Sequence, residues 1–120
     1  MPQAYHHVFF NAREGVADQE VINTIRRFRD LAVRKGYIQR AEDISVGKVV
    51  IPASEDSEVA RLRHQMTGGF TWAITFHLEG QEGLERYLRE SPGDIQAVNF
   101  LGLLTQPPQF MAHDHVDQLA

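Results

Sequence analysis

The fold of this chain is decided by one alternating stretch, Phe70-Thr71-Trp72-Ala73-Ile74-Thr75-Phe76-His77-Leu78. The even-numbered residues from Trp72 onward are apolar, whereas the odd-numbered residues from Thr71 onward are small or polar. A period of two is typical of a β-strand with one face in a hydrophobic core and the other in a more polar, solvent-accessible environment. Gly68-Gly69 directly precede the stretch and mark a turn. The sequence therefore predicts a half-buried strand.

Two elements are predicted in the first third of the chain. Aromatic and β-branched residues over 4–12 favour a strand. A helix then follows from Asp18, as its N-cap, to Gly36, because a glycine can adopt the left-handed backbone that stops a helix. Its apolar residues recur at helical spacing: Val21, Ile22, Ile25, Phe28, Leu31 and Ala32.

The remaining elements give the order β-α-β-(short α)-β-α-β, an α+β, ferredoxin-like split βαβ protomer. They are an extended stretch over 37–51 closed by Pro52, a short polar helix over 54–66, the alternating strand, a helix from Gln81 that restarts at Ser91-Pro92 and continues to Pro107, and a last strand over 109–116. Helices on one sheet face leave the other uncovered. We expect a second copy of the chain to cover it, giving a homodimer.

Composition narrows the class of protein. With 120 residues, of which 42% are hydrophobic and 23% charged, we expect one globular domain over 1–120. Sixteen acidic and twelve basic residues give a net charge of -4, which argues against a nucleic-acid partner. The absence of cysteine excludes disulfides and thiol chemistry. No apolar run or signal-peptide pattern predicts a membrane or secreted protein, so a cytoplasmic location is expected.

Several short motifs together carry a family resemblance. They are His6-His7-Val8-Phe9-Phe10 with Glu14-Gly15-Val16, then Gly69-Phe70-Thr71, Leu84-Glu85-Arg86-Tyr87-Leu88, Ser91-Pro92, and a closing strand that contains Asp114. This pattern resembles the stress-responsive A/B barrel domain (Dabb) family of the dimeric α+β barrel superfamily, over nearly the whole chain except an insertion at 53–66. The resemblance implies a ferredoxin-like protomer and a homodimer whose two sheets close into a barrel.

One member type of this family is a plant polyketide cyclase, which uses a histidine and a tyrosine in an intramolecular aldol condensation. The resemblance places His6 at the family's first-strand histidine and Tyr87 at its helix tyrosine. Three positions depart from the cyclase pattern, because Trp72, Ser91 and Asp94 stand where such members carry histidines. An aspartate at a helix N-terminus is a weak base, so capping is the favoured role of Asp94.

Strand alternation predicts a ligand pocket beneath the helices. His6 and Tyr87 are the catalytic candidates there. The predicted ligand-binding residues are Trp72, Asp114, Phe110, Ile74, Val8 and Asp94. A carboxylate beside His6 would hold its imidazole in one tautomer, and the aromatic walls suit a flat, partly polar organic ligand. The alternative is that His6 is a satisfied core histidine with Asp114 as its structural partner, and that Trp72 only packs.

The opposite sheet face carries a second histidine group. His7, His77 and either His113 or His115 are expected to converge there, and three imidazoles can bind zinc, nickel or iron. Histidines that merely titrate at an interface are the commoner outcome. The sequence therefore predicts neither a metal nor another cofactor, and leaves these four residues as candidates.

Three functions fit these observations. The leading hypothesis is a homodimeric barrel that binds a small, partly aromatic ligand, with a cofactor-independent cyclase or isomerase as its enzymatic form. The alternatives are a non-catalytic, stress-associated dimerisation module and a small cofactor-independent monooxygenase. An open cavity with His6, Tyr87 and Asp114 facing one another favours ligand binding, whereas a cavity filled by aromatic side chains favours the dimerisation module.

Overall fold

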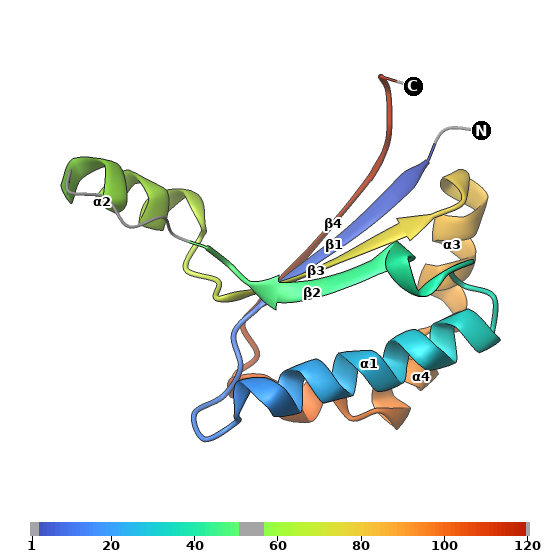
Figure 1. The fold of residues 1–120 in the computed structure, drawn as a ribbon, viewed down its shortest axis with the longest axis horizontal. Coiled ribbons are helices and arrows are strands. Elements are labelled where there is room, and N and C mark those ends of the chain that lie inside the picture. The colour runs from blue at the N-terminus through green and yellow to red at the C-terminus, as the bar shows by residue number, and fades with distance from the viewer. Residues whose placement is uncertain (1–2, 51–56, 120) are drawn as a thin grey trace.

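The computed structural model, which describes residues 3–50 and 57–119, is built on one antiparallel sheet (Figure 1). Its strands are β1 (Ala4–Phe10), β2 (Ile44–Lys48), β3 (Trp72–Leu78) and β4 (Phe110–Val116). They lie in the order β2-β3-β1-β4, and every neighbouring pair is antiparallel. This confirms the predicted ferredoxin-like arrangement.

The helices divide into a main layer and one outlying helix (Figure 1). The main layer contains α1 (Asp18–Arg34), α3 (Gly80–Glu90), α4 (Pro92–Ala97) and the 3₁₀ turns η1 (Ala41–Asp43) and η2 (Phe100–Leu103). The outlying helix, α2 (Ser57–Met66), lies beyond the end of β2 and away from the other helices. Within the described residues, no helix combines the length and apolar character needed to cross a membrane.

The core lies between the sheet and the main helix layer. The strands contribute their even-numbered residues, because directly opposed residues in the register share a face. Buried sheet residues are Phe10, Trp72, Ile74, Phe76 and Leu78, and α1 contributes Val21, Ile25, Phe28 and Ala32. Burial of each large side chain stabilises the fold by about 1.5–3 kcal/mol. The predicted alternation of β3 and helical spacing of α1 are thus confirmed.

Several predicted boundaries differ from the structure. Asp18 is the first residue of α1 rather than its cap, and no side-chain cap bond forms there. In the described part of the extended stretch 37–51, only Ile44–Lys48 is a strand. The Asp43 carboxylate accepts hydrogen bonds from the backbone of Gln39 and Arg40 and holds a turn there. The predicted stop at Pro52 lies outside the described residues.

The last helical segment is shorter than predicted. It restarts at Pro92 as expected, but α4 ends at Ala97 instead of continuing to Pro107. Asn99 adopts a left-handed backbone with φ of 59°, which an α-helix cannot accommodate. The chain then continues as η2, and this irregular segment forms one wall of the cavity described next.

Candidate functional site

A cavity of about 330 Å³ lies between the β1–β4 side of the sheet and the helices α3 and α4. We call it the His6 cavity. Its sheet side consists of His6, Val8, Phe110 and Ala112, and its other walls consist of Tyr87, Leu88, Ser91, Pro92, Ile95, Phe100 and Leu101. This volume is within the range of small-molecule sites, and nearly all of its lining is apolar.

The hollow has a simple origin in side-chain size. Val8 and Ala112 face each other in the β1–β4 register and are both small. On the β3 side of the sheet, the bulky side chains of Trp72 and Phe76 fill the space between the sheet and the helices instead. The space therefore opens toward β4, which is an edge strand.

His6 and Asp114 form the polar centre beside this cavity. They are directly opposed on β1 and β4, and His6 Nδ1 contacts the Asp114 carboxylate. A carboxylate only accepts hydrogen bonds, so Nδ1 carries the proton and Nε2 is left as the basic nitrogen. His6 is buried, whereas the Asp114 side chain remains 31% exposed. Asp114 itself is not part of the cavity lining.

Tyr87 covers His6 from α3. Their ring centroids lie 5.2 Å apart, and the Tyr87 ring is buried against Phe76 at 5.0 Å. Burial raises the pKa of Tyr87 above its ordinary value, and a hydrogen bond with the Ser91 side chain acts in the opposite direction. The hydroxyl therefore stays protonated at neutral pH. Its chemistry is that of a hydrogen-bond donor rather than a base.

Asp94 lies outside the His6 cavity, contrary to its predicted ligand contact. Its Oδ1 accepts a hydrogen bond from Lys35 Nζ at 2.6 Å, and its Oδ2 accepts one from Tyr37 Oη at 2.7 Å. The hydrogen bond from Lys35, and to a smaller extent the one from Tyr37, holds the pKa of Asp94 below its usual range. Burial and the same carboxylate raise the pKa of Tyr37 to about 12. Asp94 thus connects the end of α1 to α4.

Trp72 and Ile74 also lie outside the cavity lining. Both are buried in the core on β3, an inner strand of the sheet. The Trp72 ring stacks on Phe10 at 6.1 Å, and Lys48 Nζ lies 5.7 Å from its centroid. The structure therefore gives Trp72 the packing position that was the alternative to ligand contact. Of the predicted residues, His6, Tyr87, Val8 and Phe110 do line the cavity.

The four other histidines of the sheet share its opposite face, as the alternation predicts: His7, His77, His113 and His115. Tyr5 lies between two of them, with centroid distances of 4.9 Å to His77 and 5.1 Å to His115. His7 stacks on His115 at 5.4 Å. Burial lowers the pKa of His7, and the nearby His115 imidazole lowers it further by a smaller amount.

The arrangement of these imidazoles in the described structure does not bring three of them together as metal ligands. Within residues 3–50 and 57–119, no group of three His, Asp or Glu side chains is placed to hold a metal ion. The intervening Tyr5 ring separates His77 from His115, and His77 Nδ1 instead lies 3.6 Å from the Asp43 carboxylate. His113, opposite His7 in the register, belongs to no such group.

Seven lining residues were not predicted: Leu88, Ser91, Pro92, Ile95, Phe100, Leu101 and Ala112. Alternation around Phe110 and Asp114 would have placed Ala112 on the same face. Helical spacing from Leu84 likewise places Leu88 one turn further along α3. The α4–η2 wall had no comparable signal, because it depends on the break at Asn99.

No protein-family model and no curated protein sequence matches this chain. Solved structures do resemble it. The chain is similar to a hydroxynitrile lyase from Passiflora edulis, with a TM-score of 0.63 and 14% identity over 99% of this chain and 96% of that one. It is also similar to SnoaB, a cofactor-independent oxygenase from Streptomyces nogalater, with a TM-score of 0.62 and 10% identity over 98% and 95% of the two chains.

Two further structures share the ferredoxin-like fold. A dimeric ferredoxin-like protein of unknown function from Thermobifida fusca has a TM-score of 0.59 and 14% identity, over 97% of this chain and 92% of that one. A Dabb family protein with a ferredoxin-like fold, from Mesorhizobium loti, has a TM-score of 0.50 and 13% identity over 98% of both chains. The chain thus has a ferredoxin-like fold, and solved structures similar to it include enzymes and proteins of unknown function.

Proposed function

We propose that this chain is a Dabb-type protomer that binds a small, flat, partly aromatic molecule in the His6 cavity and moves a proton on it. The observation that carries the proposal is the position of His6. Its imidazole lines an apolar cavity, while its Nδ1 is held by Asp114.

The arrangement suits abstraction of a proton from a carbon next to a carbonyl group. His6 Nε2 takes the proton, and the electron pair of the C–H bond moves onto the carbonyl oxygen to give an enolate. Asp114 stabilises the resulting imidazolium, and the Tyr87 hydroxyl donates a hydrogen bond to the enolate oxygen. Return of the proton from His6 to another carbon gives an isomerisation. In a cyclisation, the enolate carbon attacks a second carbonyl of the same molecule, so that a C–C bond forms and the π bond of that carbonyl breaks. The resulting alkoxide takes the proton back from the His6 imidazolium.

We further propose that the protein is a homodimer through the uncovered sheet face. The main helix layer covers only the other face (Figure 1). The uncovered face presents the Tyr5–histidine stack together with Phe9 and Met111, of which Met111 is 40% exposed. An aromatic face of this kind is suited to a two-fold copy of itself, and similar structures are described as dimeric.

Binding is tested with 2-naphthol, a flat fluorescent phenol, titrated into the wild type and into His6→Gln and Tyr87→Phe. The matched control is His113→Gln, on the other face of the same sheet. We expect saturable binding by the wild type and the control, and weakening by about fivefold or more in the two cavity variants, since each loses a polar contact. Equal affinity in all four proteins would contradict the proposed site.

Proton transfer is tested with 1-indanone in deuterium oxide, by following deuterium uptake at the carbon next to the carbonyl. We expect the wild type to accelerate uptake and His6→Gln to lose about 10²-fold or more of that acceleration. Binding of 2-naphthol without any acceleration would identify a non-catalytic binding protein. Absence of both would favour the dimerisation module.

A further inference from the structure

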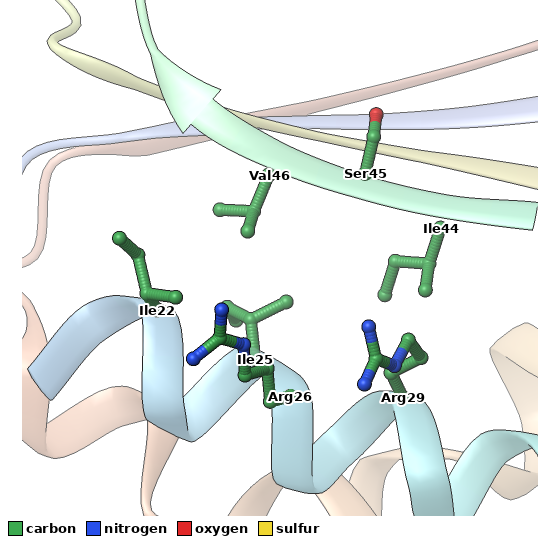
Figure 2. Close-up of a pocket in the computed structure, with 7 residues that line it drawn as sticks. All are labelled: Ile22, Ile25, Arg26, Arg29, Ile44, Ser45 and Val46. Atoms are coloured by element: carbon green, nitrogen blue, oxygen red, sulfur yellow. The ribbon is translucent and has the colours of Figure 1, made fainter. Parts of the chain in front are cut away.

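A second hollow lies between α1 and β2, at the sheet edge opposite β4 (Figure 2). We call it the α1–β2 groove. Its volume is about 300 Å³, and it is lined by Ile22, Ile25, Arg26, Arg29, Ile44, Ser45 and Val46. It shares no lining residue with the His6 cavity, so the two hollows are distinct.

The inner part of this groove is aliphatic. Figure 2 shows Ile44 and Val46 pointing from β2 toward α1, whereas Ser45 points away from the helix. Ile25 and Ile44 are nearly buried, with 5% and 7% of their surfaces exposed. Four branched side chains with space between them form a surface that a hydrocarbon chain can cover with a gain in free energy.

Two arginines lie beside this aliphatic surface. Arg26 and Arg29 are three residues apart on α1, so they are neighbours on one helix face, and both guanidinium groups extend toward β2 in Figure 2. Arg29 Nε is buried and has no hydrogen-bond partner among the described residues. Among the described residues it forms one ion pair, with Asp30, whose carboxylate oxygen lies 3.5 Å from Nε and whose side chain is 70% exposed. No acidic residue belongs to the groove lining.

The local charge contrasts with the rest of the chain. The protein carries a net charge of -4, yet α1 has the run Arg26-Arg27-Phe28-Arg29. Phe28 is buried in the core, and Arg27 donates a hydrogen bond to Thr24 Oγ1 without lining the groove. Only Arg26 and Arg29 therefore combine a positive charge with the aliphatic surface.

We propose that the α1–β2 groove binds an amphiphilic anion, namely a carboxylate on a short aliphatic chain. The carboxylate lies between the two guanidinium groups and accepts charge-assisted hydrogen bonds from them. The chain lies along Ile22, Ile25, Ile44 and Val46 and excludes water from them. A volume near the lower end of the range for ligand sites favours a short chain over a long fatty acid.

The probe for this proposal is octanoate, titrated into protein with labelled isoleucine methyl groups and followed by NMR. We expect the methyl signals of Ile22, Ile25 and Ile44 to shift and that of Ile95, in the His6 cavity, to stay unchanged. Arg26→Gln combined with Arg29→Gln should weaken binding about tenfold or more, because two charge-assisted contacts are lost. The matched control Arg27→Gln should bind as the wild type does.

Three further measurements separate the proposal from its alternatives. Added sodium chloride should weaken octanoate binding to the wild type, a result that needs no variant to fold. Acetate has the carboxylate without the long chain, and octanol has the chain without the charge. Both should therefore bind more weakly than octanoate. The proposal would be overturned by equal octanoate affinity in the double variant and Arg27→Gln, or by a methyl shift at Ile95 instead of Ile22. The two arginines would then only cover the apolar surface with their aliphatic stems while their charges remain in water.

Discussion

His6 on β1 and Asp114 on β4 lie directly opposite each other, and the Nδ1 proton of the imidazole is donated to the carboxylate. One cross-strand pair therefore sets the orientation of the imidazole and its tautomer. The residues are 108 positions apart in the sequence, so only the closing strand brings them together.

The first prediction concerns this pair. In Asp114→Asn, an amide replaces the carboxylate, so the charge that stabilises the imidazolium is lost while the shape is kept. We expect deuterium uptake by 1-indanone to fall about tenfold or more, with 2-naphthol affinity changed by less than about threefold. Loss of affinity without loss of rate would assign Asp114 to binding.

A second prediction concerns the cavity floor. Ala112→Phe places a ring over Val8 and fills the His6 cavity from an exposed edge strand. We expect 2-naphthol binding to be lost while the free energy of unfolding in urea falls by less than about 1 kcal/mol. The control Met111→Phe makes a similar change on the opposite face and should leave binding intact. Retained binding in Ala112→Phe would place the ligand elsewhere.

A third prediction separates Asp94 from the site. Asp94→Ala removes the partner of Lys35 and leaves the buried Tyr37 hydroxyl without its shorter hydrogen bond. We expect the free energy of unfolding to fall by about 1–3 kcal/mol, measured by urea denaturation. Affinity for 2-naphthol should stay the same, because Asp94 is not part of the cavity lining. A variant with normal stability and impaired binding would restore Asp94 to the ligand site.

A fourth prediction follows from the lowered pKa of His7. The folded state disfavours the imidazolium, so below about pH 6.5 the unfolded chain binds more protons than the folded chain at this residue. The stabilising effect of neutral His7 is therefore present above pH 6.5 and is lost as the pH falls from there toward the lowered folded value. We expect His7→Gln to lose less stability than the wild type between pH 7.5 and 5.5 in urea denaturation. Parallel pH profiles would contradict this.

The sequence predicted the sheet well because period-two alternation is a local property of each strand. The alternation correctly placed His6 and His7 on opposite faces of the sheet. Alternation does not say which side chains touch within a face. The Tyr5 ring between His77 and His115 therefore emerged only from the register, although Tyr5 follows the same pattern as its neighbours.

The parts of the site that were not predicted depend on packing between distant elements. Asp94 bonds to Lys35, a residue 59 positions earlier, only because α1 and α4 lie against each other. Trp72 is in the core rather than the cavity because β3 lies on the other side of β1 from β4, and the cavity lies on the β1–β4 side of the sheet. The cavity itself arises from the small residues Val8 and Ala112 in register, a pairing that no single segment encodes.

The central claim is that the imidazole of His6 offers a basic Nε2 to a ligand in the cavity. It is tested most directly by nitrogen-15 NMR of the histidine side chains with and without 2-naphthol. We predict that free His6 is protonated on Nδ1, and that its Nε2 signal is the one that moves when the phenol binds. A His6 protonated on Nε2, or a response confined to the histidines of the opposite face, would contradict the account.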